Sequence, residues 1–157
     1  MCIDCVKRFI DACWNRNVAV VDEMINNGFV PVPLFDGEPS PLIIAIEEGF
    51  FDIAEIILKS KVDVNYKDDM GTTALQAAAC CGNEKLVQAL LKKGAINQKD
   101  FTERSASDYA RIKGFNRIAE EIDTFPYDLN SVGNGIFVRA RKAIGMICCG
   151  KHVKDYN

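Results

Sequence analysis

The sequence predicts an all-α protein: a solenoid of four stacked helix-turn-helix units with finger loops between them, followed by a C-terminal tail helix. Three observations lead to this prediction: a pattern with a period of about 33 residues, apolar residues at helical spacing within each period, and turn-prone stretches between periods. One such unit is too small to bury its own apolar face, so we expect the core to form between neighbouring units.

This period organises most of the chain. The two clearest units share Leu42, Ala45 and Gly49 in one copy and Leu75, Ala78 and Gly82 in the next. One full period before Leu42 stands Phe9, in a first unit, and Gly114 of a fourth unit follows Gly82 after a period that is one residue shorter. We expect one domain over residues 1–126, with repeats over about 3–36, 37–69, 70–101 and 102–126, and a separate tail over 127–157.

Each unit carries start and stop signals for its first helix. Ser40, Thr73 and Ser105 stand directly before the first helices, where a side-chain oxygen caps free backbone N–H groups. Gly49 and Gly82 stand where this helix must end and the chain must turn into the second helix, which suits a residue that adopts positive φ.

The third unit resembles the ankyrin repeat family. It reads Asp68-x2-Gly71-x-Thr73-Ala74-Leu75-Gln76-x-Ala78-Ala79-x2-Gly82, and the second unit keeps Ser40-Pro41-Leu42 and Asp63-Val64-Asn65. The resemblance covers roughly residues 3–125. The signature histidine of the family is replaced by Ile43, Gln76 and Asp108, so the hydrogen bonds that it usually makes between repeats are an open point.

By this resemblance the chain is a non-enzymatic protein-protein interaction module, or adaptor, that binds partners on a concave surface of first helices and finger loops. Exposed aromatic, methionine and arginine side chains carry much of the energy of such interfaces. The residues expected on this surface are Trp14, Glu47, Glu48, Tyr66, Asp69, Met70, Thr72, Cys80, Cys81, Phe101, Arg104 and Lys113. Trp14 can also be interpreted as a partly buried residue at the end of the stack. Residues 29–35 can be interpreted as a segment that packs beneath the first finger.

The charge is divided unevenly along the chain. Residues 1–126 contain 14 basic and 20 acidic residues, net −6, whereas residues 127–157 contain 5 basic and 2 acidic residues, net +3. An acidic repeat domain favours a protein partner with a basic patch. It argues against nucleic acid, whose phosphates require cationic side chains.

The tail shows a basic amphipathic pattern. Its apolar positions are Ile136, Phe137, Ala140, Ala143, Ile144 and Ile147, and its basic positions are Arg139, Arg141 and Lys142. Three interpretations are open: a helix that covers an apolar side of the last repeat, a helix that binds a partner, or membrane-surface attachment with Cys148 and Cys149 as lipidation sites. The last would make the chain a membrane-associated adaptor.

Catalysis, cofactors and metals are not expected. Phosphate-binding, zinc-protease and nucleophile motifs do not occur in the sequence, and its single histidine is His152. Cys2 and Cys5 would form a zinc site only with Cys148, Cys149 and His152, across four helical layers of roughly 25–30 Å in all. Seven cysteines, an odd number, favour reduced thiols. Since the sequence shows no signal-peptide pattern and no long apolar stretch, we expect a cytoplasmic protein, in a host cell if the chain is a secreted effector or a viral protein. We also expect a monomer.

Overall fold

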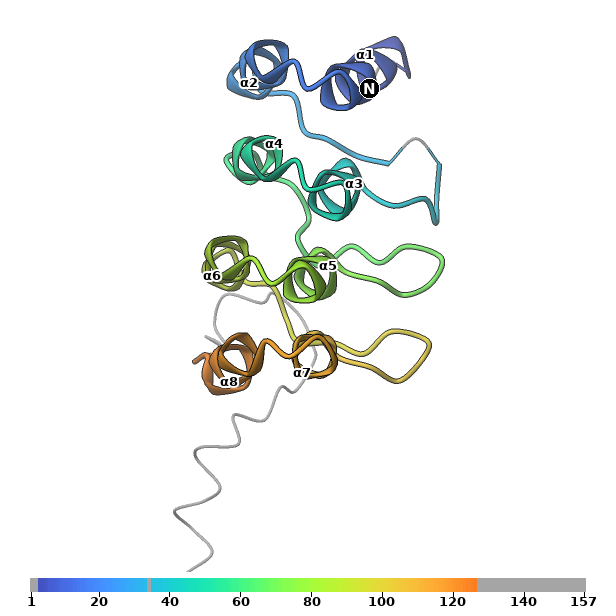
Figure 1. The fold of residues 1–157 in the computed structure, drawn as a ribbon. Helices are drawn as coiled ribbons and strands as arrows, with labels where there is room; N and C mark the ends of the chain where they lie inside the picture. Colours follow the sequence, from blue (N-terminus) through green and yellow to red (C-terminus); the bar gives the residue numbers. More distant parts are fainter. Residues whose placement is uncertain (1–2, 34, 127–157) are drawn as a thin grey trace, which may run out of the picture.

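The computed structural model describes residues 3–33 and 35–126, where eight helices stand in two columns (Figure 1). The inner column holds α1 (Ile3–Trp14), α3 (Pro41–Glu47), α5 (Ala74–Cys81) and α7 (Ala106–Ile112), and the outer column holds α2 (Val18–Asn26), α4 (Phe51–Ile57), α6 (Glu84–Lys92) and α8 (Asn116–Thr124). Within these residues there is no strand, only an isolated antiparallel bridge between Lys99 and Ser105. The predicted all-α solenoid is confirmed, and the predicted tail helix lies outside the described residues.

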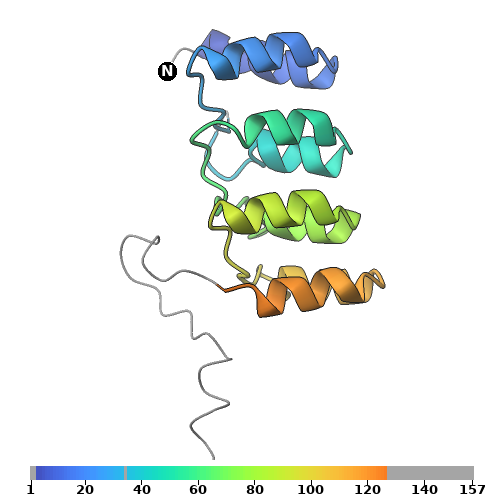
Figure 2. The same cartoon turned by 90° about the vertical axis from the view of Figure 1, so that its left-hand side faces the viewer.

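The helices pair along the chain, and the resulting hairpins stack. Each inner helix contacts the outer helix that follows it, and each column is continuous, α1 to α7 and α2 to α8. The loops between units project to one side as three fingers, formed by residues 27–40, 58–73 and 93–105 (Figure 1). The outer helices run parallel to one another and end on the side from which the fingers leave (Figure 2).

The inner helices begin at the residues that the sequence predicts. The hydroxyl oxygens of Ser40, Thr73 and Ser105 each accept a hydrogen bond from the backbone N–H three residues later. Thr73 and Ser105 also form capping boxes, in which the side chains of Gln76 and Asp108 bond back to the cap. These bonds satisfy N–H groups that have no partner inside the helix.

The residue that follows the turn inside each hairpin alternates between two roles. Asn17 and Asn83 cap the outer helix, because their side-chain oxygens accept a hydrogen bond from a first-turn N–H. Phe50 and Phe115 occupy the same position in the second and fourth units and make no side-chain cap. The ring of Phe115 instead packs over Gly82 of the preceding unit.

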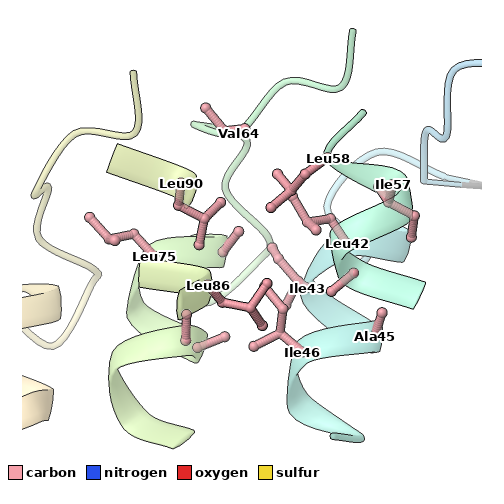
Figure 3. Packing of buried hydrophobic residues seen from close by; sticks show 14 of the residues in the cluster. Leu42, Ile43, Ala45, Ile46, Ile57, Leu58, Val64, Leu75, Leu86 and Leu90 are labelled. Atoms are coloured by element: carbon pink, nitrogen blue, oxygen red, sulfur yellow. The ribbon is translucent and has the colours of Figure 1, made fainter. Parts of the chain in front are cut away.

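The core lies between the two columns and between successive layers (Figure 3). Its fully buried large side chains include Phe9, Leu42, Ile43, Ile46, Ile53, Ile57, Leu75, Leu86, Leu90, Leu91 and Ile122. They come from all four units, so neighbouring units supply one another's apolar environment, as expected of a solenoid.

Gln76 replaces the signature histidine of the third unit and still links it to the next. Its side chain is buried; Oε1 accepts from the N-cap N–H at 2.7 Å, and Nε2 donates to the carbonyls of Gln98 (3.3 Å) and Arg104 (2.9 Å). Ile43 offers no polar atom at the equivalent position, and the carboxylate of Asp108 bonds to its own helix cap. The hydrogen bonds that the signature histidine usually makes between repeats are therefore replaced by those of Gln76 in the third unit, and the residues at this position in the second and fourth units differ from it.

The last unit ends the stack with a polar face. Arg111 and Asp123 stand one repeat after Ala79 and Leu91, which are buried in the third unit. Both polar side chains are exposed and form an ion pair with each other. At these two positions the end of the stack therefore carries a charged pair, whereas the three interpretations of the tail fall on residues outside the described part of the chain.

Candidate functional site

The site residues predicted on the inner column lie at the turn ends of its helices, one group in each unit. They are Trp14 on α1, Glu47 and Glu48 at the end of α3, Cys80 and Cys81 on α5, and Lys113 after α7. All are exposed except Cys80, which is half-buried. Because the inner helices stack, these side chains follow one another down the inner column.

Trp14 combines the two interpretations of the sequence. Its side chain is 51% exposed, and its ring meets the ring of Phe50 edge-on with centroids 6.4 Å apart. The guanidinium of Arg16 lies 5.1 Å from the centre of the Phe50 ring, and Arg16 also pairs with Asp52 at 3.6 Å. Trp14 therefore stands against the second unit and leaves about half of its surface open.

Large apolar side chains are exposed at the tips of the fingers, one on each. Phe35, Met70 and Phe101 are 69%, 62% and 75% exposed, and we call these three residues the finger row. Phe35 was expected to pack beneath its finger but is exposed, whereas Pro31 of the same segment is buried and Phe29 packs against the core with its ring centre 5.0 Å from that of Phe9. Phe35 aligns with Asp68 and Asp100 in the repeat register, and not with Met70 or Phe101, so the period carries no signal for its exposure.

Neighbouring fingers are hydrogen-bonded to each other. The N–H of Asp69 donates to the carbonyl of Gly37 at 2.8 Å, and the N–H of Phe101 donates to the carbonyl of Met70 at 3.3 Å. The ammonium of Lys67 donates to the carbonyl of Lys99 at 3.0 Å. These bonds connect the three fingers, so the finger row is held in place along the stack.

The second and third fingers are each closed by a buried or half-buried aspartate. Oδ1 of Asp68 accepts from the N–H groups of Met70 (2.9 Å) and Thr72 (2.8 Å), and Oδ1 of Asp100 accepts from those of Thr102 (2.7 Å) and Arg104 (3.1 Å). Burial raises the pKa of Asp100, but hydrogen bonds from the Tyr109 and Thr102 hydroxyls and from backbone N–H groups outweigh burial and lower it to about 2.

Tyr66 and Thr72 are less available than the sequence suggested. Tyr66 is half-buried, and its hydroxyl accepts from the N–H of Gly37 (3.2 Å) and donates to the carbonyl of Glu38 (2.9 Å). The N–H of Thr72 is bound to Asp68, and its side chain is half-buried. Tyr66 therefore connects two fingers instead of serving as a free anchor, whereas Asp69 and Arg104 are exposed as expected.

The middle of the inner column is acidic and holds a protonated thiol. Burial raises the pKa of Glu47, and the nearby carboxylates of Asp68 and Glu48 raise it further. Burial, Cys80 and Glu47 raise the pKa of the Cys81 thiol, although Lys113 opposes this, and Cys81 Sγ lies 3.6 Å from the carbonyl oxygen of Ile46. A thiol with a raised pKa is a weak nucleophile at neutral pH, so this arrangement presents charge and shape more than reactivity.

Negative charge is concentrated in the first half of the stack. Residues 17–58 contain eight acidic residues and no lysine or arginine. Asp22 and Asp52 have ion-pair partners, Lys59 and Arg16. Among the described residues, five carboxylates of the first two fingers and of α3 have no cationic partner within 4.0 Å: Asp36, Glu38, Glu47, Glu48 and Asp69.

The described residues offer no grouping of three or more cysteine, histidine, aspartate or glutamate side chains suited to a metal. Cys5 is exposed on α1, while Cys2, Cys148, Cys149 and His152 lie outside the described residues, as do the proposed lipidation sites. In the same part of the chain, no helix is both long and apolar enough to cross a membrane.

These features define the class of protein. A stack of helical hairpins with hydrogen-bonded fingers and an exposed inner face is typical of an interaction domain built from repeats. Residues 9–100 match the family model described as ankyrin repeats (3 copies). The chain therefore belongs to the ankyrin repeat family, whose repeats generally mediate protein-protein interaction and form a non-enzymatic fold.

Curated relatives contain similar sequence within much longer proteins. The chain is 29% identical over 143 residues to alpha-latroinsectotoxin-Lt1a of Latrodectus tredecimguttatus, covering 83% of this chain and 10% of the toxin. It is 29% identical over 109 residues to the probable E3 ubiquitin-protein ligase XBOS32 of Oryza sativa subsp. japonica, covering 65% and 22%. It is 33% identical over 103 residues to the E3 ubiquitin-protein ligase XBAT33 of Arabidopsis thaliana, covering 62% and 20%. The chain thus spans about a fifth or less of these relatives.

Proposed function

We propose that the chain is a non-enzymatic adaptor that binds a partner protein on its concave surface, the face formed by the inner helices and the fingers. The finger row carries this proposal, because Phe35, Met70 and Phe101 are at least 62% exposed on three fingers that hydrogen bonds hold together. Water-exposed apolar side chains of this size gain on the order of 1.5–3 kcal/mol each when a partner buries them fully.

Trp14 and the polar residues around the row complete the proposed surface. Trp14 offers a half-exposed indole at the first unit, and indole is a side chain that frequently dominates binding energy. Asp69, Arg104 and Lys113 are exposed and would form the polar rim of the interface. Because the stack is built from repeated layers, the partner meets a preformed surface and little ordering is required on this side.

A partner with a basic patch fits the charge of this surface. The carboxylates of Asp36, Glu38, Glu47, Glu48 and Asp69 lack cationic partners among the described residues. Cationic side chains on a partner would pair with these carboxylates. Such pairing steers association and sets the orientation of the partner more than it adds affinity. Binding should therefore weaken as the salt concentration rises.

Quantitative affinity capture tests the proposed surface. The baits are the full chain, the triple variant F35A/M70A/F101A, and a matched control, E55A/K85A/K92A, which shortens three exposed side chains of the outer helices. The proposal predicts that recovery of the captured protein falls at least about tenfold with the triple variant and is unchanged with the control. Equal recovery with all three baits, or equal loss with both variants, contradicts it.

A further inference from the structure

We propose that the chain's own basic segment, residues 136–147, docks on the finger side of the stack over the first two fingers, and thereby competes with a partner for that surface. The contact is within one chain, so it goes beyond the proposed function and does not depend on which partner binds. Four observations support the proposal: the charge of the two surfaces, their exposed apolar side chains, the path of the chain, and the charged groups at the end of the last repeat.

Charge complementarity is present within the chain. The negative charge of the stack is gathered in residues 17–58, with eight acidic and no basic residues. On the first two fingers Asp36, Glu38 and Asp69 are exposed and have no ion-pair partner among the described residues. Residues 136–147 carry three basic side chains and no acidic one: Arg139, Arg141 and Lys142. The second finger also contains Lys59, Lys61 and Lys67, so the charge complementarity to the segment is strongest on the first finger, which has two acidic and no basic residues.

Apolar surface is available on both sides. Phe35 and Met70 stand on the same two fingers, 69% and 62% exposed. Large apolar residues flank the basic positions of the segment on both sides, namely Ile136, Phe137, Ile144 and Ile147. As a helix its twelve residues would be roughly 18 Å long. Two neighbouring layers at a spacing of ~8–10 Å offer a surface of that length.

The described chain ends on the outer column, at the same end of the helices from which the fingers leave (Figures 1 and 2). Pro126 stands one repeat after Gly94 in the register that links Gly82 to Gly114, so residue 127 starts where a further finger would begin. The C-terminal end of α8 lies on the same side as the ends of α2, α4 and α6, from which the three fingers leave (Figure 2). Residues 127–135 span at most ~30 Å when extended. The first finger lies between two and three layers of ~8–10 Å each from the last unit, so the linker covers that distance along the stack. Because α8 belongs to the outer column, the chain must also pass beside the inner column to reach the fingers (Figure 1).

The end of the last repeat is a poorer site for the segment. The positions that a following unit would cover carry Arg111 and Asp123, already paired with each other, and Arg111 also lies 3.6 Å from Asp108. An apolar helix face placed there would bury these charged groups, which costs free energy. The first two fingers offer both unpaired carboxylates and exposed apolar side chains.

Hydrogen exchange of the full-length chain, followed by mass spectrometry on peptides covering residues 136–147, tests the docking. The variants are R139E/R141E/K142E in the segment and D36K/E38K on the first finger. The matched control is E23K/E55K, which makes the same charge change on α2 and α4 within residues 17–58. A fifth form combines the segment and finger reversals. Thermal unfolding of each form checks that the stack is intact.

The proposal predicts slowed exchange in residues 136–147 of the native chain, independent of protein concentration. Exchange should accelerate about fivefold with either reversal, stay slow with the control, and slow again when both reversals are combined. Exchange at random-coil rates in the native chain, or protection that is insensitive to D36K/E38K, overturns the proposal. Loss of protection with the control equal to that with D36K/E38K also overturns it, since the contact would then lie elsewhere or be nonspecific.

Discussion

The ring of Phe115 lies over Gly82, the glycine one repeat earlier that turns the chain from α5 into α6. A β-carbon at position 82 would stand 2.4 Å from the nearest ring atom. Gly82 has φ of 71°, a conformation that glycine adopts at no steric cost. Glycine is therefore required at position 82 for two reasons: the turn has positive φ, and the aromatic ring of the next unit occupies the space of a β-carbon.

Replacing Gly82 by alanine should destabilise the stack by about 2 kcal/mol, from backbone strain and displacement of the Phe115 ring. Gly49→Ala is the matched control, because Gly49 has φ of 74° but a β-carbon added there would meet nothing within 4 Å. It should cost only about 1 kcal/mol from strain alone. Urea unfolding followed by circular dichroism measures both, and a Gly82→Ala cost no larger than that of Gly49→Ala would refute the role of the ring.

Replacing Gln76 by leucine should destabilise the third and fourth units. The change leaves the carbonyls of Gln98 and Arg104 without their buried donor, at a cost of about 2–3 kcal/mol. Gln88→Leu, at a half-buried position on α6, is the control and should change the free energy of unfolding by less than about 0.5 kcal/mol. Equal stability of the Gln76→Leu variant and the native chain would show that the cross-repeat bonds contribute nothing net.

The Asp100 carboxylate should make the stack less stable in acid. Its folded pKa of about 2 lies below the ordinary value of 3.8, so its contribution is complete above pH ~4 and is lost as the pH falls through about 2. Asp100→Asn should therefore cost roughly 1–2 kcal/mol at pH 6 and much less near pH 2. Urea unfolding of both proteins from pH 2 to pH 6 gives this difference directly. A difference that does not vary with pH would contradict the proposed network around Asp100.

The described cysteines should differ in their reaction with iodoacetamide. Cys5 is exposed on α1 and should react first, while Cys13 is buried with its pKa raised to about 12 and should react only when the first unit opens. Cys81 should react slowly because burial, Cys80 and Glu47 raise its pKa. Timed alkylation read by mass spectrometry gives this order, and labelling of Cys13 as fast as Cys5 would be inconsistent with the packing of α1.

Removing the charge of Glu47 should activate Cys81. Glu47→Gln takes away one cause of the raised pKa, so alkylation of Cys81 at pH 7.5 should become about two- to threefold faster. Glu55→Gln, on the outer helix α4, is the control and should leave the rate unchanged. An unchanged rate with Glu47→Gln would place the two side chains farther apart than the structure does.

The periodic sequence predicts the features that depend on position within one unit. Ser40, Thr73 and Ser105 cap helices, and Gly49 and Gly82 take positive φ, because local geometry alone demands these residues. Contacts between units are not readable in this way. The bonds of Gln76, the hydroxyl of Tyr66 and the exposure of Phe35 depend on how far apart two layers stand, which no single unit encodes. The register carries no signal for the finger row, because Phe35 aligns with Asp68 and Asp100 and not with Met70 or Phe101.

The central claim is that the fingers and the inner column, not the outer helices, form the binding surface. Hydrogen exchange of the full chain with and without its captured partner tests this most directly. We predict slowed exchange on binding at residues 35–38, 68–72 and 101–104 and at the turn ends of α1 and α3, with α2, α4, α6 and α8 unchanged. Protection confined to the outer helices, with unchanged exchange in the fingers, would contradict the account.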